Sequence, residues 1–416
     1  TQTGQTASKY ALDGGFLTFA DENNESGDIY ISSMRFQDRV MTASEIQALG
    51  TVHAGGAATA GVQMTDNPAD FKAGSFTIAI LGDTQIYSRN DTNTDILKQS
   101  TQWLVDNKDA RNIQHVIHVG DISDDSSLAQ TTRTRTAMDT LNGEISYSVV
   151  RGNHDIYNSS TTFDRADTFG SGSAYGQQTS LVGYVGSGGE AQSTRNTYQT
   201  FEANGVKFLV LNLDISAKTE VVDWAKQVVS THHDHRVIIN THAYMSDGGE
   251  RFNGAIDPNT GKTYDALRAA DLVGHNESAY NGSKYGGQDA EVLWNTLVSQ
   301  YENIFLVISG HQFENYDQFK YKLDEGVNGN LVYQILVNQQ DMSLGGSGWI
   351  RLLEFDPDDE TIRVKTYSPY LDAWDTSADV YYNIGMSAIP EPSTYAWGLG
   401  LTLAGIGALC RRRRKA

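Results

Sequence analysis

Five short apolar runs are each followed, within three residues, by a side chain that can bind a metal ion. Each run has five or six residues, the usual length of a strand, and the runs are FTIAIL (76–81), HVIHV (115–119), ISYSVV (145–150), RVIIN (236–240) and IFLVIS (304–309). Continuous apolar runs are typical of strands that are covered on both faces. The pattern therefore predicts a buried sheet whose strand ends carry the functional side chains.

Helical segments alternate with these strands. Apolar residues recur at helical spacing in 95–107 and in 218–230, and a further strand is expected at 206–213. After residue 330 the apolar runs read as antiparallel strands, the last two joined by the turn DPDDE: 331–337, 350–355 and 362–367. Parallel strands with crossover helices and an antiparallel portion predict a layered α/β sandwich.

The residues at the strand ends form one candidate constellation. A single histidine is more often structural than a ligand, and a Gly-Asp pair is commonly just a turn. Five such strand ends in succession carry more weight, because the carboxyl ends of parallel strands lie at the same edge of a sheet. The candidate residues are Asp83, Asp121, Asn153, His154, Asp155, His242 and His311.

The order of these motifs, DTQ, GDISD, GNHD, TH and GHQF, resembles the pattern of the calcineurin-like metallophosphoesterase family. The resemblance covers residues 75–370 and implies a four-layer α/β/β/α sandwich with two divalent metal ions bridged by one carboxylate. It implies that Asp121 is this bridge and that Asn153, His242 and His311 complete one metal site. A carboxylate, an amide oxygen and two imidazoles suit Mn, Fe or Zn.

The other metal site departs from the family pattern. Asp83 is its expected private ligand, but Gln85 and Phe313 stand where the family has two histidines. Gln85 therefore marks a damaged or retuned second site. The DTQ tripeptide and the later stretch GGSGWIRLLEFDP resemble a subgroup of the family, which indicates an inherited change. An oxygen-dominated site favours Mg, Mn or Ca over Zn, and candidates for replacement oxygens are Gln312, Glu314 and Gln339.

The resemblance also implies the chemistry. A metal-activated hydroxide would attack the phosphorus of a phosphate mono- or diester in line with the leaving group. His154 would protonate the leaving oxygen or stabilise the equatorial oxygens, and Asp155 would orient its imidazole. The alternative is a surface binding module that retains the fold but has lost efficient catalysis. The intact GNHD motif favours the enzyme, because a binding module has no need of a catalytic histidine.

The charge of the chain bears on its partners. The formal net charge is −20 at pH 7, and five of the 31 basic residues stand in the last six positions. A surface this acidic repels nucleic acid, so we expect no nucleic-acid partner. The chain contains a single cysteine, Cys410, which excludes an intrachain disulfide bond.

Residues 1–52 resemble the C-terminal end of a laminin-G-like (concanavalin-type) jelly roll. Within them, residues 28–50 read as a strand followed by a short helix, with Thr42 and Glu45 as a capping box. About 50 residues are too few for a complete jelly roll, so the domain would be truncated here. The alternative is a strand that pairs with the main domain. A Gly/Ala-rich linker over 53–74 follows.

After a second predicted linker at 371–388, residues 389–416 resemble the PEP-CTERM sorting signal of Gram-negative bacteria. They combine Pro-Glu-Pro, 19 uncharged residues at 392–410 and a basic tail. As a helix, these 19 residues would span about 28 Å, close to the hydrocarbon thickness of a bilayer. The resemblance implies transient insertion into the inner membrane, cleavage by an exosortase-type enzyme, and export to the cell envelope, the cell surface or the exterior. A simple C-terminal anchor is the alternative.

Overall fold

The structure, a computed structural model, describes residues 61–159, 161–183, 194–215, 217–246, 249–252, 289–312, 319–357, 361–377 and 380–385. The jelly-roll resemblance and the sorting signal lie outside these residues and stay predictions. Among the described residues, no helix has the length and apolar character needed to cross a membrane. The predicted span 392–410 lies outside the described residues.

One sheet contains eight strands and is parallel only at one side. Its order is β1 (Val62–Gln63), β15 (Tyr382–Gly385), β13 (Thr361–Ser368), β12 (Ile350–Asp356), β2 (Phe76–Leu81), β3 (Ile113–His118) and β4 (Ser146–Val149), and β14 (Ala373–Asp375) pairs with β13. Strands β2, β3 and β4 are parallel, and the other pairs are antiparallel. The carboxyl ends of β2, β3 and β4 therefore lie at one edge of this sheet.

The second sheet has seven strands with a parallel centre. Its order is β10 (Phe319–Glu325), β11 (Leu331–Val337), β9 (Ile304–Ser309), β8 (Arg236–Thr241), β7 (Val206–Leu213), β6 (Thr197–Ala203) and β5 (Leu181–Gly183). Strands β11, β9, β8 and β7 are parallel to one another, whereas β10, β6 and β5 join antiparallel at the two sides. Strands β8 and β9 are buried along their whole length, as the continuous apolar runs predict.

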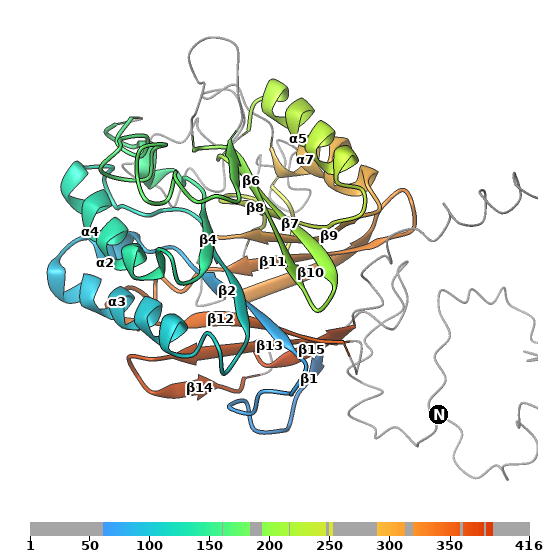
Figure 1. Cartoon of the computed structure of the whole chain (residues 1–416), viewed down its shortest axis with the longest axis horizontal. Helices are drawn as coiled ribbons and strands as arrows, with labels where there is room; N and C mark the ends of the chain where they lie inside the picture. Colours follow the sequence, from blue (N-terminus) through green and yellow to red (C-terminus); the bar gives the residue numbers. More distant parts are fainter. Residues whose placement is uncertain are drawn as a thin grey trace, which may run out of the picture.

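The two sheets and the helices outside them form layers (Figure 1). Three apolar clusters fill the spaces between these layers. The central cluster lies between the two sheets and includes Phe76, Phe208 and Phe355. A second cluster packs α3 (Asp91–Asp106) and α4 (Leu128–Met138) on the outer face of the first sheet. A third packs α5 (Thr219–Thr231) and α7 (Ala290–Thr296) on the second sheet. The predicted α/β fold is confirmed for the described residues.

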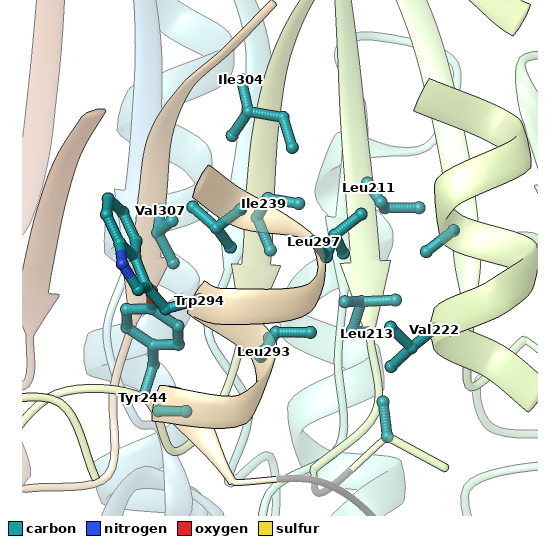
Figure 2. Close-up of a cluster of buried hydrophobic side chains, with 14 of the residues drawn as sticks. Leu211, Leu213, Val222, Ile239, Tyr244, Leu293, Trp294, Leu297, Ile304 and Val307 are labelled. Atoms are coloured by element: carbon teal, nitrogen blue, oxygen red, sulfur yellow. The ribbon is translucent and has the colours of Figure 1, made fainter. Parts of the chain in front are cut away.

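Figure 2 shows the third cluster in detail. Leu293 and Trp294 of α7 and the following Leu297 lie over Ile239 of β8 and Val307 of β9. Each of these side chains is buried. Apolar burial of this kind stabilises a fold by about 25 cal/mol per Å² of surface removed from water, so the packing holds the strand ends in place.

The predicted boundaries need three corrections. Helix α3 begins at Asp91, not at residue 95, because the Asn90 side chain accepts a hydrogen bond from the Asn93 backbone N–H and caps the helix earlier. Strand β11 was predicted as antiparallel, but it pairs parallel with β9 and antiparallel only with β10. Both predicted linkers contribute strands: β1 lies in 53–74, and β14 and β15 lie in 371–388.

Candidate metal centre

The candidate residues occupy the carboxyl ends of parallel strands from both sheets. Asp83 follows β2, Asp121 follows β3, and Asn153 and His154 follow β4. From the second sheet, His242 directly follows β8 and His311 follows β9. Because the two sheets are stacked with these ends at one rim, residues far apart in the sequence meet, as the hydrogen bond from the His311 backbone N–H to Asp83 shows.

Four side chains form what we call the imidazole site: Asp121, Asn153, His242 and His311. Nitrogen or carboxylate oxygen atoms of Asp121, His242 and His311 all lie within 4.8 Å of one another. His242 Nε2 is 3.0 Å from Asn153 Oδ1 and 3.3 Å from Asp121 Oδ2. All but Asn153 are buried.

The geometry of His242 fits a bound cation. Its Nδ1–H donates to the Val119 carbonyl at 2.9 Å, which leaves the Nε2 lone pair toward Asn153 Oδ1 and Asp121 Oδ2. Three electron-rich atoms at such short distances repel one another unless a proton or a metal ion lies among them. Ligands at right angles around an ion at about 2.1 Å are about 3 Å apart, which matches these separations. Apart from the contact with His242 Nε2 at 3.3 Å, the buried Asp121 Oδ2 has no hydrogen-bond partner among the described residues.

Charge among these groups shifts their pKa values. Burial lowers the pKa of His242, but the carboxylates of Asp121 and Asp83 outweigh it and raise the pKa to about 9. Burial raises the pKa of Asp121, and the neighbouring histidines, His242 foremost, lower it to a net value well below the usual range. Asp121 is therefore ionised, as a metal ligand must be.

Backbone strain accompanies the site. Asp121 has φ 50° and His311 has φ 77°, a left-handed conformation that is costly for residues other than glycine. Such strain persists only where the surrounding structure imposes it, and it is common at functional sites. Gly152 is required sterically, because a Cβ there would lie 2.0 Å from Asp121 Oδ1. The glycine of the GNHD motif thus leaves room for the carboxylate.

Asp83 begins a second group, which we call the amide site: Asp83, Gln85 and Gln340, with Asp121 shared. Asp83 Oδ2 accepts hydrogen bonds from the His311 N–H at 3.0 Å and from Gln340 Nε2 at 3.3 Å. Asn338 Nδ2 donates to the same oxygen at 2.9 Å. Burial is the main cause that raises the pKa of Asp83 well above its usual value, despite the opposing charge of His242.

Two amide oxygens of the amide site have no hydrogen-bond partner among the described residues. They are Gln85 Oε1 and Gln340 Oε1, both buried. The Thr84 N–H donates to the Asp121 carbonyl, so the turn that carries Gln85 lies against Asp121. Buried amide oxygens without partners are unfavourable unless an ion or water satisfies them. The donor set therefore fits a hard cation such as Mg or Mn.

Sequence reasoning named other replacement ligands for this site. The amide oxygen of Gln339 packs against Gly82, so closely that a Cβ added to Gly82 would lie 2.2 Å from it. The residue that contacts Asp83 is instead the neighbouring Gln340. Gln312 is described, but Phe313 and Glu314 lie outside the described residues. Nothing in the local sequence distinguishes Gln339 from Gln340, because only the path of the turn after β11 decides which one faces Asp83.

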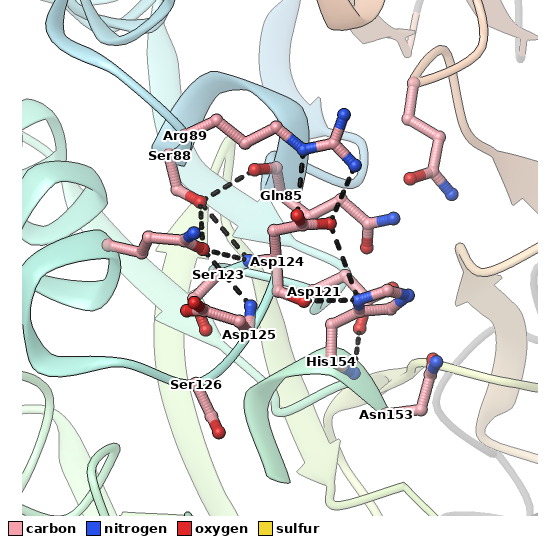
Figure 3. Close-up of polar contacts among 12 residues, drawn as sticks. Gln85, Ser88, Arg89, Asp121, Ser123, Asp124, Asp125, Ser126, Asn153 and His154 are labelled. Carbon is pink, nitrogen blue, oxygen red and sulfur yellow. Dashed lines mark hydrogen bonds and ion pairs between the residues drawn. The ribbon is translucent and has the colours of Figure 1, made fainter. Parts of the chain in front are cut away.

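His154 lies beside the imidazole site, and its N–H donates to Asp121 Oδ1 at 2.9 Å. Its ring Nδ1–H donates to the Asp124 carbonyl at 2.6 Å, and the Asp124 carboxylate is 3.7 Å away (Figure 3). Arg89 holds that carboxylate through two hydrogen bonds of 2.8 and 2.9 Å. Asp124, the last residue of GDISD, thus contacts the His154 ring, a contact that the sequence did not predict.

The contacts of Asp155 differ from the one predicted for it. Its two carboxylate oxygens accept hydrogen bonds from the N–H groups of Gly152, Ile122 and Ser123 and from the Ser123 hydroxyl, at 2.8 to 3.1 Å. Burial is the main cause that raises the pKa of Asp155 to about 6. Asp155 thus ties the GDISD turn to the GNHD turn, and Asp124 orients the His154 imidazole instead.

An α/β sandwich that gathers a carboxylate, an amide oxygen and two imidazoles at its strand ends, beside a further histidine, defines a metal-dependent hydrolase. Residues 76–315 match the family model described as calcineurin-like phosphoesterase. The chain belongs to this family. The donors of the imidazole site are those that the sequence resemblance implied.

Relatives of known sequence or structure were found at low similarity. The chain is 28% identical over 313 residues to the uncharacterized protein YvnB of Bacillus subtilis (strain 168). The match covers 71% of this chain and 20% of YvnB, so the chain spans about a fifth of that relative's length.

Similar solved structures include a purple acid phosphatase, PPD1, from yellow lupin, with a TM-score of 0.39, 12% identity and coverage of 78% of this chain and 55% of the phosphatase. The 5'-nucleotidase precursor of Thermus thermophilus has a TM-score of 0.38 and 12% identity, with coverage of 81% and 60%. GAP50, the anchor in the inner membrane complex of Plasmodium, has a TM-score of 0.38 and 12% identity, with coverage of 77% and 96%.

Proposed function

We propose that this protein hydrolyses small or surface-bound phosphate mono- or diesters at two divalent metal ions. The observation that carries the proposal is the approach of His242 Nε2 to Asn153 Oδ1 and Asp121 Oδ2, three electron-rich atoms at spacings that a bound metal ion would fit. Asp121, Asn153, His242 and His311 would hold one ion, and this set suits Mn, Fe or Zn. Asp83, Gln85, Gln340 and the shared Asp121 would hold the second.

Bound divalent ions would lower the pKa of water and neutralise phosphate charge. The chain itself positions the substrate and moves a proton. The Asp124 carbonyl accepts a hydrogen bond from His154 Nδ1–H and so orients the imidazole, which would donate a proton to the leaving oxygen or a hydrogen bond to the phosphate. Arg89 fixes Asp124, and Asp124 fixes the plane of the imidazole.

The burial of the centre supports catalysis by electrostatic stabilisation. Asp83, Asp121 and His242 are each almost completely removed from solvent. In such an environment, fixed charges act more strongly on a developing negative charge than they do in water. The net charge of −20 disfavours a nucleic-acid substrate, because an acidic surface repels a polyanion.

The proposal includes export. The support is sequence alone: Pro-Glu-Pro at 390–392, the uncharged stretch 392–410 and the basic tail. An exosortase-type enzyme would cleave near the tripeptide after transient insertion into the inner membrane, and the catalytic domain would act in the cell envelope, at the surface or outside.

A direct test uses the purified full chain loaded with Mn or Zn. Hydrolysis of phenyl phosphate and of diphenyl phosphate is measured, together with metal content by mass spectrometry. We expect turnover of at least one substrate that disappears in Asp121→Asn along with bound metal. A metal-loaded protein that binds phosphate esters but turns over neither substrate would instead indicate the binding module.

A further inference from the structure

A buried histidine joins the two turns that carry ligands of the amide site. His118 is the last residue of β3, and its side chain is completely buried. Its ring Nδ1 accepts a hydrogen bond from the Gly120 N–H at 3.1 Å, and its Nε2 lies 2.9 Å from the Thr84 hydroxyl oxygen. Gly120 directly precedes Asp121 in the GDISD turn, and Thr84 is the central residue of the DTQ turn. The imidazole therefore bridges these two turns.

These two contacts fix the tautomer of the ring. A backbone N–H can only donate, so Nδ1 of His118 must present its lone pair to Gly120. The proton of the neutral imidazole is then on Nε2, which donates it to Thr84 Oγ1. Burial is the main cause that lowers the pKa of His118 to about 3. The ring is thus neutral at pH 7, with one donor and one acceptor, each directed at a different turn.

The two turns also contact each other and the imidazole site. The Thr84 N–H donates to the Asp121 carbonyl at 3.1 Å. Gly120 has φ 105°, and a Cβ there would lie 2.7 Å from His242 Nδ1. The GDISD turn therefore fits closely against His242 and against the DTQ turn. A shift of the DTQ turn would move Gln85 relative to Asp121, because Gln85 directly follows Thr84.

We infer that His118 is a positioning residue of the amide site, which holds Gln85 at the distance from Asp121 that a second metal ion requires. The inference rests on the proposed function, in which Gln85 and Asp121 share that ion. His118 acts through Thr84 and Gly120, as partners behind metal ligands commonly do. Loss of the contact with Thr84 frees the DTQ turn. The imidazole site stays intact, because none of its ligands lies in that turn.

Substitution of Thr84 tests the contact from the side of the DTQ turn. Thr84→Val nearly preserves the shape of the side chain but cannot accept the Nε2 proton of His118. Leaving a buried donor unpaired corresponds to about a 5- to 100-fold change in an equilibrium constant. We expect the second Mn ion to bind more weakly by a factor in this range, and the first ion to bind as in the parent. Thr84→Ser keeps the hydroxyl and should retain both parent affinities.

A matched pair of histidine substitutions separates positioning from folding. Asparagine places an acceptor near the position of Nδ1 but is too short to reach Thr84, so His118→Asn should weaken the second ion as Thr84→Val does. His115→Asn is the control, because His115 lies in the same strand, is equally buried, and contacts Ser148 Oγ at 3.1 Å. Both changes remove a buried imidazole, but only His118→Asn should affect the second ion. Equilibrium dialysis of the full chain against increasing Mn concentrations measures both affinities.

A second measurement needs neither metal nor turnover. Proton–nitrogen correlation NMR spectra distinguish the two neutral tautomers of histidine, and we expect the His118 proton on Nε2 in the metal-free parent. A proton on Nδ1 would overturn the inference, because the ring could then not accept from Gly120. Unchanged binding of the second ion in both Thr84→Val and His118→Asn would overturn it as well. A parent that binds two Mn ions and responds as expected to both changes, yet hydrolyses no ester, would support the inference while the proposed function fails.

Discussion

Dialysis of the purified protein should leave one divalent metal ion per chain, bound in the imidazole site, while the amide site empties. The imidazole site offers two histidines, a carboxylate and an amide oxygen, of which His242 is already oriented by the Val119 carbonyl. The amide site must be remade before it can bind, because Asp83 Oδ2 now accepts hydrogen bonds from Asn338 and Gln340.

The size of the difference follows from these two contacts. A hydrogen bond to a charged group contributes about 1.5–3 kcal/mol, and both amides must turn their oxygens toward an ion at Asp83. Giving up two such bonds costs about 3–6 kcal/mol, which weakens binding by about 10²- to 10⁴-fold relative to a site with oriented ligands. Weak oxygen-ligated sites have dissociation constants of about 10⁻⁴ to 10⁻³ M, and we expect the amide site to fall in this range.

The assay is the metal-to-protein ratio, measured by mass spectrometry after dialysis and again at increasing Mn concentration. We expect a ratio of about one that rises to about two in the millimolar range. Gln340→Ala should abolish the second step and leave the first, whereas Gln339→Ala, whose amide oxygen faces Gly82, serves as the neighbouring control. The double change Gln85→His with Phe313→His should strengthen the second step.

Two results would refute this reasoning. One is a ratio of two after dialysis with both ions equally resistant to removal, which would mean that further ligands complete the amide site. The other is a second binding step that survives in Gln340→Ala unchanged, which would exclude this side chain as a donor.

Three further predictions concern catalysis, acid stability and processing. His154→Ala should keep its metal content but lose about 10²- to 10⁴-fold in kcat; parental turnover would disprove the role of this imidazole. Burial lowers the pKa of both His115 and His118 to about 3. Between about pH 3 and pH 6.5, these two histidines are therefore neutral in the folded protein but take up protons in the unfolded chain. Protonation then favours the unfolded chain, so the free energy of unfolding decreases as the pH falls from about 6.5 toward 3. Urea unfolding at several pH values should show a shallower pH dependence in His115→Gln, and an unchanged dependence would contradict the assignment. Mass spectrometry of the native protein should find its last residue between Pro390 and Ser393; an intact basic tail would argue against cleavage.

Much of the site could be predicted because its ligands follow strands. An apolar run of six residues places its successor at the end of a strand, and parallel strands bring those ends to one rim. Asp83, Asp121, His242 and His311 are each within two residues of such a run. These four residues could therefore be identified as candidate ligands without knowing how the sheets pack. Only the stacking of the two sheets, however, brings His242 and His311 close to Asp121.

The roles of Asp124, Asp155 and Gln340 depended on contacts that sequence does not encode locally. Asp155 adjoins His154, yet consecutive residues in a tight turn point in different directions, and its carboxylate meets the N–H groups of another turn. Asp124 is 30 positions from His154 and reaches it because β3 and β4 are adjacent.

The sequence by itself therefore determined the class of fold, the strands that precede the ligands and the chemical types of those ligands, because apolar periodicity and the residues at strand ends are local properties. Only the tertiary structure decided which residues contact one another at the site and in the sheets. It selected Gln340 over Gln339 beside Asp83, assigned Asp124 to the imidazole, and drew β1, β14 and β15 out of the predicted linkers into the sheet. The physical reason is that a hydrogen bond or a metal bond requires atoms within about 3 Å, and such proximity arises only after the two sheets have packed.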